Sequence, residues 1–194
     1  ANENLTCHNP QKIYITGSKY VDSFTQATVN RSRTLNISVN PLLPIQTDCA
    51  NITTVGTIYN FTRNSNATAT CINVLAPNIT IDCKGFMINY SQSSTGVGIN
   101  ISGVNGTTIR SCNIIQSALQ TAVDTSDTAT NYSFGIFVSN GAYAYIYNNT
   151  IKTSDGTAHA IFLLNVNTTD ALIYNNNITT YGGSAYGLFA SFSP

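Results

Sequence analysis

The second half of the chain repeats itself, and this repeat constrains the fold more than any other feature of the sequence. The segment IYNNTIKTSDGTAHAIF, which begins at Ile146, returns as IYNNNITTYGGSAYGLF from Ile173. Aligned on their strand-like runs, five blocks begin, in steps of 27, 37, 25 and 27 residues, at Cys71, Gly98, Gly135, Ala160 and Gly187. The long step contains a polar insertion, residues 118–133, which reads as a loop. A period of this length is typical of a solenoid, in which each block is one structural unit.

Each block contains three short alternating runs separated by turn residues. One equivalent position is occupied by Ile81, Ile109, Ile146 and Ile173, and another, five residues later, by Phe86, Ile114, Ile151 and Ile178. Three short strands per turn of about 25 residues predict a parallel β-helix, because one coil cannot bury its apolar face but stacked coils can. We expect an all-β solenoid of about five coils over residues 71–194. Lead-in strands over residues 49–70 and an irregular, β-rich arm or cap over residues 1–48 would precede it.

Strand alternation assigns the two faces of each run. The residues expected to point inward are Ile99, Ile101, Ile136, Val138, Ile161 and Leu163, while Asn100, Phe137 and Phe162 point outward. Two outward aromatic groups follow: Phe137, Phe162 and Phe189 on one face, and Tyr143, Tyr145, Tyr147, Leu172 and Tyr174 on another. Solvent-facing aromatic side chains in such number mark a partner surface. The alternative is that the insertion or residues 1–48 fold over one of these faces and bury it.

The asparagines between the second and third runs have a physical role in such a coil. Asn tolerates the left-handed backbone conformation, which bends the chain at a corner, and its amide both donates and accepts hydrogen bonds. Equivalent asparagines of stacked coils can therefore bond to one another along the solenoid. We predict two such pairs, Asn148 with Asn175 and Asn149 with Asn176. The alternative is a surface loop without stacking.

The charge pattern argues against two classes of partner. Only 8% of the residues are charged, the formal net charge is zero, and no run of Lys or Arg occurs. The chain thus lacks the electrostatic footprint for nucleic acid or an anionic membrane. No segment reaches the roughly 18 to 20 consecutive apolar residues that a membrane span needs. The start, ANENLTCHNP, contains no signal region, and Ala1 would fit a mature chain whose signal peptide has been removed.

Asparagine-linked glycosylation is the best indication of compartment. Chance pairing of the 25 Asn with the 45 Ser and Thr residues would give about 6 Asn-x-Ser/Thr sequons. The chain has 14, at Asn4, Asn30, Asn36, Asn51, Asn60, Asn66, Asn78, Asn89, Asn100, Asn105, Asn131, Asn148, Asn167 and Asn177. Structural co-occurrence of Asn and Thr could account for part of the surplus. We expect a secreted, N-glycosylated surface protein.

The five cysteines favour disulfides over a metal site. None forms a CxxC pair, so zinc or thioredoxin-type redox use is poorly supported. Cys83 and Cys112 would lie at the same corner of adjacent coils, where strand spacing allows a bridge. Cys49 and Cys71 form a second candidate pair. Cys7 would then be free for a contact between subunits, although a bond between Cys7 and Cys49 satisfies the same arithmetic.

The repeat also carries a family resemblance. The blocks GIFVSNGAYAYIYNNTI and AIFLLNVNTTDALIYNNNI resemble the right-handed parallel β-helix repeats of pectin-degrading enzymes and many large surface proteins, the pectate-lyase-like superfamily. The segment from Cys49 to Phe86 is similar to the opening of secreted β-helix proteins from the cell surface of archaea. The resemblance covers about residues 49–194 and implies a right-handed coil, but no one function, since this architecture hosts many activities. Residues 1–48 could cap the first coil, form a separate β-unit or pair with a neighbouring subunit.

The pectin-degrading relatives work with clustered carboxylates, as acid and base or as calcium ligands. Here only Asp82 falls at a strand end of the repeat. The equivalent positions in later coils are Arg110, Tyr147 and Tyr174, so no carboxylate of a neighbouring coil can partner Asp82. We therefore expect no catalytic residue in this chain.

The remaining candidates for a metal or catalytic site are isolated. Asp124 and Asp127 share the insertion, but two ligands fall short of the roughly six to eight oxygens that calcium takes. His8 and His159 have no obvious nucleophile or metal-ligand neighbour in the sequence. We expect neither a metal nor a cofactor.

Two classes of function remain. The first is a structural subunit of an extracellular surface filament or layer, assembling through open solenoid ends, the N-terminal arm and the outward aromatic faces. The last block, GLFASFSP, starts a coil and stops, so either the chain continues in a longer protein or this end stacks on the next subunit. The second is an adhesin or glycan-binding module whose tyrosines stack on sugars. Polysaccharide cleavage is the third and weakest expectation.

Overall fold

The computed structural model describes residues 3–6, 34–37, 45–117, 133–140, 143–166 and 171–191. Outside these ranges lie most of the insertion 118–133 and the residues Cys7, His8, Asn30, Asp124, Asp127, Asn131 and Asn167. The chain divides into two units, Ala1–Leu43 and Pro44–Pro194. In the first unit the backbone of β1 (Glu3–Thr6) pairs antiparallel with that of β2 (Thr34–Ile37), which places Asn4 opposite Asn36.

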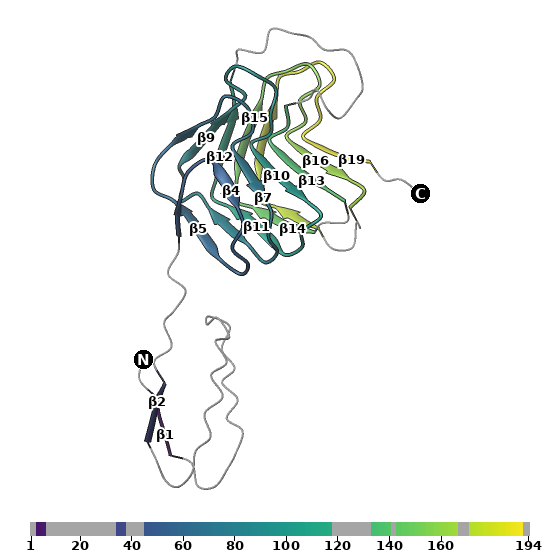
Figure 1. The fold of residues 1–194 in the computed structure, drawn as a ribbon. Coiled ribbons are helices and arrows are strands. Elements are labelled where there is room, and N and C mark those ends of the chain that lie inside the picture. Colours follow the sequence, from purple (N-terminus) through teal and green to yellow (C-terminus); the bar gives the residue numbers. More distant parts are fainter. Residues whose placement is uncertain are drawn as a thin grey trace. The chain divides into compact units, whose positions relative to one another are not determined.

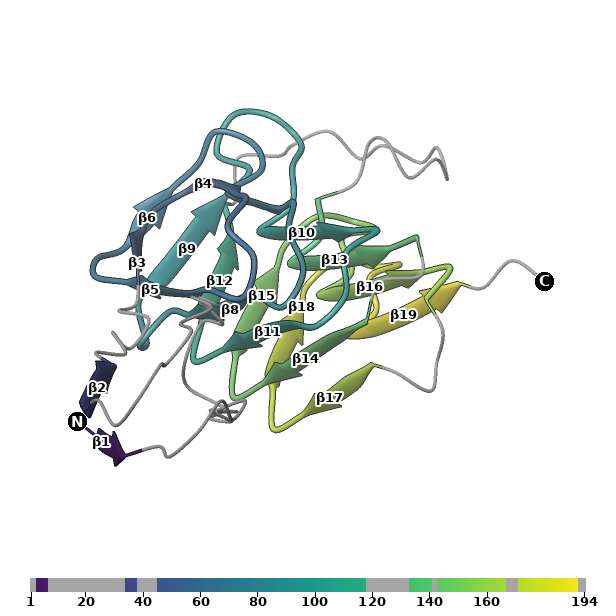
Figure 2. The same ribbon diagram turned by 60° about the horizontal axis from the view of Figure 1, so that its bottom comes forward.

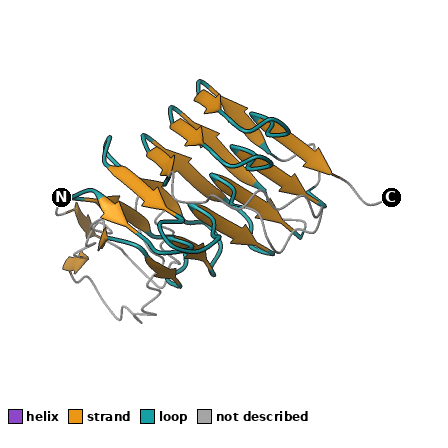
Figure 3. Cartoon of the chain, turned by 90° about the horizontal axis from the view of Figure 1, so that it is seen from above, coloured by secondary structure: helices purple, strands orange, loops and turns teal. Residues whose placement is uncertain are grey.

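The second unit is a right-handed parallel β-helix built from three parallel sheets (Figures 1 and 2). Sheet 1 consists of β4 (Ala50–Ile52), β7 (Ile72–Val74), β10 (Ile99–Ser102), β13 (Ile136–Ser139), β16 (Ile161–Leu164) and β19 (Leu188–Ser191). Sheet 2 consists of β3 (Ile45–Thr47), β5 (Ile58–Phe61), β8 (Thr80–Asp82), β11 (Thr107–Arg110), β14 (Ala144–Tyr147) and β17 (Leu172–Tyr174). Sheet 3 consists of β6 (Ser65–Asn66), β9 (Met87–Tyr90), β12 (Asn113–Gln116), β15 (Thr150–Thr153) and β18 (Asn177–Thr180). Figure 3 shows the coils stacked strand upon strand.

Alternation along each strand builds the core. Each sheet has a fully buried inward column of isoleucines. The column of sheet 1 is Ile72, Ile99, Ile136 and Ile161. That of sheet 2 is Ile81, Ile109 and Ile146, and that of sheet 3 is Ile88, Ile114 and Ile151. β-branched side chains suit these positions because they pack well on a pleated surface. All six residues predicted to point inward, including Ile101, Val138 and Leu163, are buried. The core is therefore a continuous stack shared by all coils.

A residue in the left-handed conformation turns the chain from sheet 2 into sheet 3 in four successive coils. These residues, with φ between 53° and 56°, are Lys84, Ser111, Asn148 and Asn175. The first of the four corners is longer, because residues 83–86 link β8 to β9 where residues 111–112 suffice in the next coil. As a result Ile88 pairs with Ile114, and the predicted equivalence of Phe86 with Ile114 was wrong.

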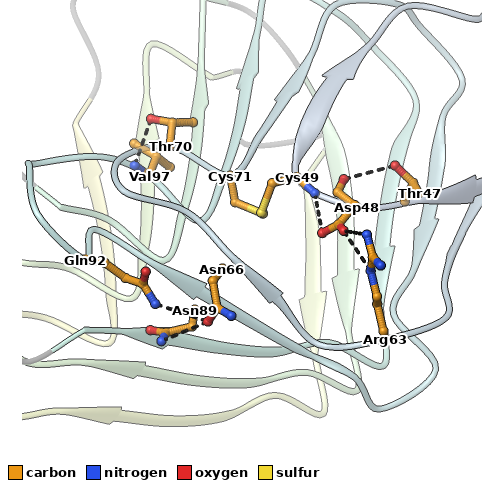
Figure 4. The surroundings of a disulfide bond; sticks show 10 residues. All are labelled: Thr47, Asp48, Cys49, Arg63, Asn66, Thr70, Cys71, Asn89, Gln92 and Val97. Atoms are coloured by element: carbon orange, nitrogen blue, oxygen red, sulfur yellow. Dashed lines mark hydrogen bonds and ion pairs between the residues drawn. A yellow bond between two sulfur atoms is a disulfide. The ribbon is translucent and has the colours of Figure 1, made fainter.

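Two disulfides join adjacent coils, one between residues in register and one between residues a single position out of register. Cys49 bonds to Cys71 just before the paired strands β4 and β7, as Figure 4 shows, and Cys83 bonds to Cys112 at the corner after β8 and β11. Their Cα–Cα distances of 4.4 and 4.6 Å match the spacing of neighbouring strands, which a disulfide can span. These are the two candidate pairs inferred from the repeat. Residues 49–70, expected to be lead-in strands, supply β4, β5 and β6, each paired in parallel with a strand of the next coil.

Candidate interaction surface

The outer face of sheet 2 carries a group of large side chains that we call the tyrosine stripe: Tyr143, Tyr145, Tyr147, Leu172 and Tyr174. Because alternate residues of a strand share a face, β14 projects Tyr145 and Tyr147 outward while Ile146 is buried. β17 repeats the pattern one coil later, with Leu172 paired to Tyr145 and Tyr174 paired to Tyr147. Tyr145, Leu172 and Tyr174 are 40%, 51% and 41% exposed. This face therefore presents a mainly aromatic surface to solvent.

One column of this face changes from charged to aromatic along the solenoid. The register places Asn60, Asp82, Arg110, Tyr147 and Tyr174 at the same position of successive coils. The rings of Tyr147 and Tyr174 stack, with their centroids 5.0 Å apart and their planes 10° from parallel. A hydrogen bond to Tyr147 raises the pKa of Arg110. The stacked rings thus form a flat surface bordered by a guanidinium that stays charged.

Asp82, the carboxylate that the repeat places at a strand end, is held by two cations. Its side chain is 4% exposed, and its Oδ2 lies 2.7 Å from Nζ of Lys84 and 2.9 Å from Nη2 of Arg110. Burial opposes its ionisation, but the hydrogen bonds from Lys84 and the charge of Arg110 outweigh burial and lower the pKa of Asp82. This arrangement keeps Asp82 ionised. Its ion pair with Arg110 joins β8 to β11, so the geometry gives Asp82 a structural role between neighbouring coils.

A general acid or a metal site would need further groups near Asp82. An acid catalyst works with a raised pKa and, in glycoside hydrolysis, with a second carboxylate. In the part of the chain that the structure describes, no three His, Cys, Asp or Glu side chains gather to hold a metal ion. The described groups in contact with the Asp82 carboxylate are the two cations Lys84 and Arg110.

The outer face of sheet 1 carries the second aromatic group, and here the expectation of solvent exposure was wrong for Phe162, while Phe137 and Phe189 are half-buried. Phe137, Phe162 and Phe189 stack with centroids 5.3 Å apart at each step. Phe162, however, is only 7% exposed. The rings of Phe134 and His159, each two residues before the strand, lie 4.8 and 5.7 Å from that of Phe162. These side chains form a small core outside the sheet.

His159 belongs to this external core. Its Nδ1 accepts a hydrogen bond from the backbone N–H of Tyr186 at 3.0 Å, and its ring lies 4.5 Å from that of Phe189. Both contacts join neighbouring coils. The geometry gives His159 a structural role.

One of the two predicted hydrogen-bonded pairs of corner asparagines forms in the structure. Nδ2 of Asn149 donates to Oδ1 of Asn176 at 3.0 Å, which confirms that pair. Asn148 lies over Asn175 in equivalent left-handed corners, as predicted, but among the described residues no hydrogen bond joins their side chains. Both side chains are exposed, which leaves them to water.

Two further asparagine ladders run along the outer faces and were missed in the sequence. On sheet 1, Asn100 donates to Asn73 at 3.0 Å and Asn73 donates to Asn51 at 2.9 Å. On sheet 3, Asn89 donates to Asn66 at 3.3 Å. The sheet 1 ladder had a signal in the sequence, because its members follow Cys49, Cys71 and Gly98 by the same two residues.

A shallow groove of about 450 Å³ runs along the corner between sheets 2 and 3. Its lining consists of Gly85, Ser111, Cys112, Asn113, Ile115, Asn148, Thr150 and Lys152. Hydroxyl, amide and ammonium groups dominate this lining, and it contains no carboxylate. The groove can therefore donate hydrogen bonds to a polar ligand but offers no acid–base pair.

Where the strands of sheet 3 end, the buried amide of Gln116 donates a hydrogen bond to the carboxylate of Asp155. Oε1 of Gln116 accepts from the backbone N–H of Ser154 at 2.9 Å, and its Nε2 donates to Oδ2 of Asp155. Burial raises the pKa of Asp155, and the hydrogen bond from Gln116 offsets only part of that rise. Asp155 thus binds its proton more tightly in the folded chain than a free aspartate does.

Comparison with known proteins does not assign a function to these surfaces. No protein-family model, curated protein or solved structure matches the chain. No helix among the described residues is long and apolar enough to cross a membrane. The geometry of the sheet faces is therefore the basis for a functional proposal.

Proposed function

We propose that this protein is a structural subunit of an extracellular surface filament or layer, and that neighbouring subunits meet through the tyrosine stripe. The observation that carries the proposal is the exposure of Tyr145, Leu172 and Tyr174 side by side on one sheet face. Contiguous exposed apolar side chains mark interaction sites, and Tyr is enriched in protein interfaces. Because the side chains project from paired strands, a partner can cover them without having to order the backbone, which reduces the entropic cost of binding.

The construction of the solenoid supports this role. Disulfides tie Cys49 to Cys71 and Cys83 to Cys112, and asparagine ladders bind further coils. Such cross-links stiffen a structure whose coils otherwise contact only their neighbours. A cross-linked solenoid with an apolar stripe on one sheet face suits repeated side-by-side contacts.

An extracellular location is supported by the same features. Disulfides persist in oxidising compartments and are rare in the cytosol. The excess of sequons and the resemblance to secreted archaeal surface proteins of pectate-lyase-like architecture point the same way. We propose that the protein is secreted and N-glycosylated.

A second candidate function, binding of a surface glycan, is favoured by one observation. The stacked rings of Tyr147 and Tyr174 lie in one column with Arg110 and Asp82. Ligand sites combine flat apolar surfaces with a few fixed polar groups. Cleavage of such a glycan would need a carboxylate free of cations, and Asp82 is paired with two.

Substitutions in the stripe separate the two functions. The double variant Tyr145→Ser, Leu172→Ser should sediment as a monomer under conditions in which the wild-type protein assembles. The matched control is Tyr181→Ser, because Tyr181 is 71% exposed but lies outside the stripe. Wild-type assembly by the double variant would contradict the proposed interface. Loss of glycan-array binding in Tyr174→Ala, with a monomeric wild type, would support the second function instead.

A further inference from the structure

We propose that the fold selects which sequons carry a glycan: Asn51, Asn66, Asn78, Asn105, Asn148 and Asn177 are modified, and Asn60, Asn89 and Asn100 are not. These nine are the sequons whose side chains the structure describes. The inference rests on the proposed extracellular location and adds modification sites to it. The Asn-x-Ser/Thr pattern alone treats all nine alike.

The chemistry of glycosylation explains why the accessibility of the amide nitrogen determines whether a sequon is modified. An oligosaccharyltransferase catalyses attack by Nδ2 on C1 of the first sugar of a lipid-linked oligosaccharide. The N–C1 bond forms, the bond from C1 to the phosphate oxygen of the lipid carrier breaks, the carrier phosphate leaves as the anion, and Nδ2 loses one proton. The product is bulky and requires a surface position. A modified asparagine must therefore direct Nδ2 to solvent, with room for a sugar.

The six proposed sites meet this requirement. All six side chains are exposed, and in the described part of the chain none uses Nδ2 in a hydrogen bond. The side-chain hydrogen bonds that three of these asparagines make use the amide oxygen as acceptor. Oδ1 of Asn51 accepts from Asn73, Oδ1 of Asn66 accepts from Asn89, and Oδ1 of Asn105 accepts from the backbone N–H of Tyr143.

The three excluded sequons have the opposite arrangement. Asn60, Asn89 and Asn100 are half-buried. Nδ2 of Asn100 donates to Asn73, and Nδ2 of Asn89 donates to Asn66. Oδ1 of Asn60 is buried and has no hydrogen-bond partner, so the amide of Asn60 has little room to turn outward.

The direction of the ladders sets this difference. In each outer ladder the nitrogen of the later coil donates to the oxygen of the earlier coil. The first asparagine of each ladder, Asn51 on sheet 1 and Asn66 on sheet 3, therefore keeps its nitrogen free. A sugar on Asn89 or Asn100 would instead have to enter between two bonded coils.

The resulting pattern matches the proposed interface. Of the nine sequons, Asn60 is the one that lies in a strand of sheet 2, and it is among the excluded three. The outer face of sheet 2 would thus carry no glycan on its described strands. Two of the proposed glycans border the tyrosine stripe without lying on its strands, because Asn105 accepts a hydrogen bond from Tyr143 and Asn148 follows Tyr147.

Site-resolved glycopeptide mass spectrometry tests the inference on the folded chain. Folded, disulfide-bonded protein made without glycans is incubated with a single-subunit oligosaccharyltransferase and a lipid-linked oligosaccharide. We expect Asn89 and Asn100 to be modified about tenfold less than Asn51 and Asn66, because modification must break a ladder hydrogen bond. The reduced, unfolded chain is the control, in which all nine sequons should be modified. Equal occupancy of Asn100 and Asn51 in the folded chain would overturn the inference.

The native protein then separates this inference from the proposed location. Glycans on the six sites support both. A native chain that carries no glycan on any sequon would contradict the extracellular proposal, while the pattern on the folded chain would still decide the inference.

The variant Asn73→Ala tests the ladder itself, because it removes the acceptor that holds Asn100. It should raise modification of Asn100 in the folded chain. Asn113→Ala is the matched control, since Asn113 lies on an outer sheet face, belongs to no sequon and is outside the ladders. An unchanged, empty Asn100 in Asn73→Ala would contradict protection by the ladder.

Discussion

Asn149 and Asn176 lie one above the other at the corner between sheets 2 and 3, and the amide of Asn149 joins three coils there. Its Nδ2 donates to Oδ1 of Asn176 and to the carbonyl oxygen of Ile109. Its Oδ1 accepts from the backbone N–H of Cys112 at 3.0 Å. Cys112 occupies the position of Asn149 one coil earlier and is bonded to Cys83. At this corner a disulfide therefore joins the coils of Cys83 and Cys112, and amide hydrogen bonds join the next two coils.

Asn149→Ala should therefore lower the free energy of unfolding by about 2 to 4 kcal/mol, since it leaves the buried backbone N–H of Cys112 without its acceptor and removes the bonds to Asn176 and Ile109. Urea unfolding followed by circular dichroism measures the change. The adjacent variant Asn148→Gly is the control. Asn148 is exposed with φ 56°, a conformation that glycine adopts freely, so its variant should stay within about 0.5 kcal/mol of the wild type. Equal losses in both variants would contradict the ladder.

Removing the Cys83–Cys112 bond in the double variant Cys83→Ser, Cys112→Ser should cost about 3 kcal/mol, because the unfolded chain gains the freedom of a closed loop. The bond spans 29 residues of sequence. Thermal unfolding with and without reductant measures the effect. Reductant should lower the Tm of the wild type by more than that of the variant, because among the described disulfides the variant keeps Cys49–Cys71 alone. An identical response to reductant would show that the Cys83–Cys112 bond contributes nothing.

Asp82→Asn should destabilise the protein at pH 7 by about 1 to 2 kcal/mol, since a buried carboxylate loses its charge-assisted bonds. The pKa of Asp82 is lowered in the folded state. Its contribution is therefore complete above the unfolded value of about 3.9 and is lost as the pH falls through the folded value. Stability measured from pH 7 to pH 2 should fall less steeply below pH 4 in the variant. Parallel curves for the two proteins would contradict a lowered pKa.

Asp155→Asn should change stability in the opposite direction. The pKa of Asp155 is raised by burial, so its ionised form weakens the fold at neutral pH. The variant keeps an oxygen that can accept from Gln116 but removes the charge. We expect a higher Tm for the variant at pH 7, and a difference that shrinks as the pH is lowered and Asp155 of the wild type takes up its proton. A lower Tm for the variant at pH 7 would contradict this assignment.

The two aromatic faces should respond differently to truncation. Phe162→Ala removes a buried ring and should cost about 3 kcal/mol. Tyr145→Ala removes a ring that is 40% exposed, so its unfolding free energy should change by less than about 1 kcal/mol while self-association weakens. Urea unfolding and sedimentation velocity measure the two effects. A large loss of stability in Tyr145→Ala would make the tyrosine stripe part of the core.

The repeat made much of the fold predictable. Once the blocks are aligned, the period fixes which residues stack, so the inward column from Ile99 to Ile161 and the Cys83–Cys112 pair follow from spacing. Spacing left Cys49 open to Cys71 or to Cys7, and the structure pairs it with Cys71. The period cannot give the length of an individual corner. Lys84 and Gly85 are both left-handed in the DCKGF corner, and the two additional residues moved the register from Phe86 to Ile88.

The surfaces were predictable in direction but not in exposure. Alternation correctly directs Phe162 away from the core, but whether an outward ring meets water depends on what lies beside it. Phe134 and His159 precede their strands and cover it, and the period contains no information about such neighbours. The direction of the asparagine ladders is likewise a matter of side-chain geometry that identical residues in a sequence cannot reveal.

Negative-stain electron microscopy of the protein isolated from its natural source tests the central proposal most directly. A structural subunit that associates through the tyrosine stripe should appear as filaments or a regular lattice. The purified double variant Tyr145→Ser, Leu172→Ser should appear as separate particles under conditions in which the wild-type protein assembles. Dispersed monomers in the native material would contradict the proposed structural role, and binding of those monomers to a glycan array would establish the adhesive function in its place.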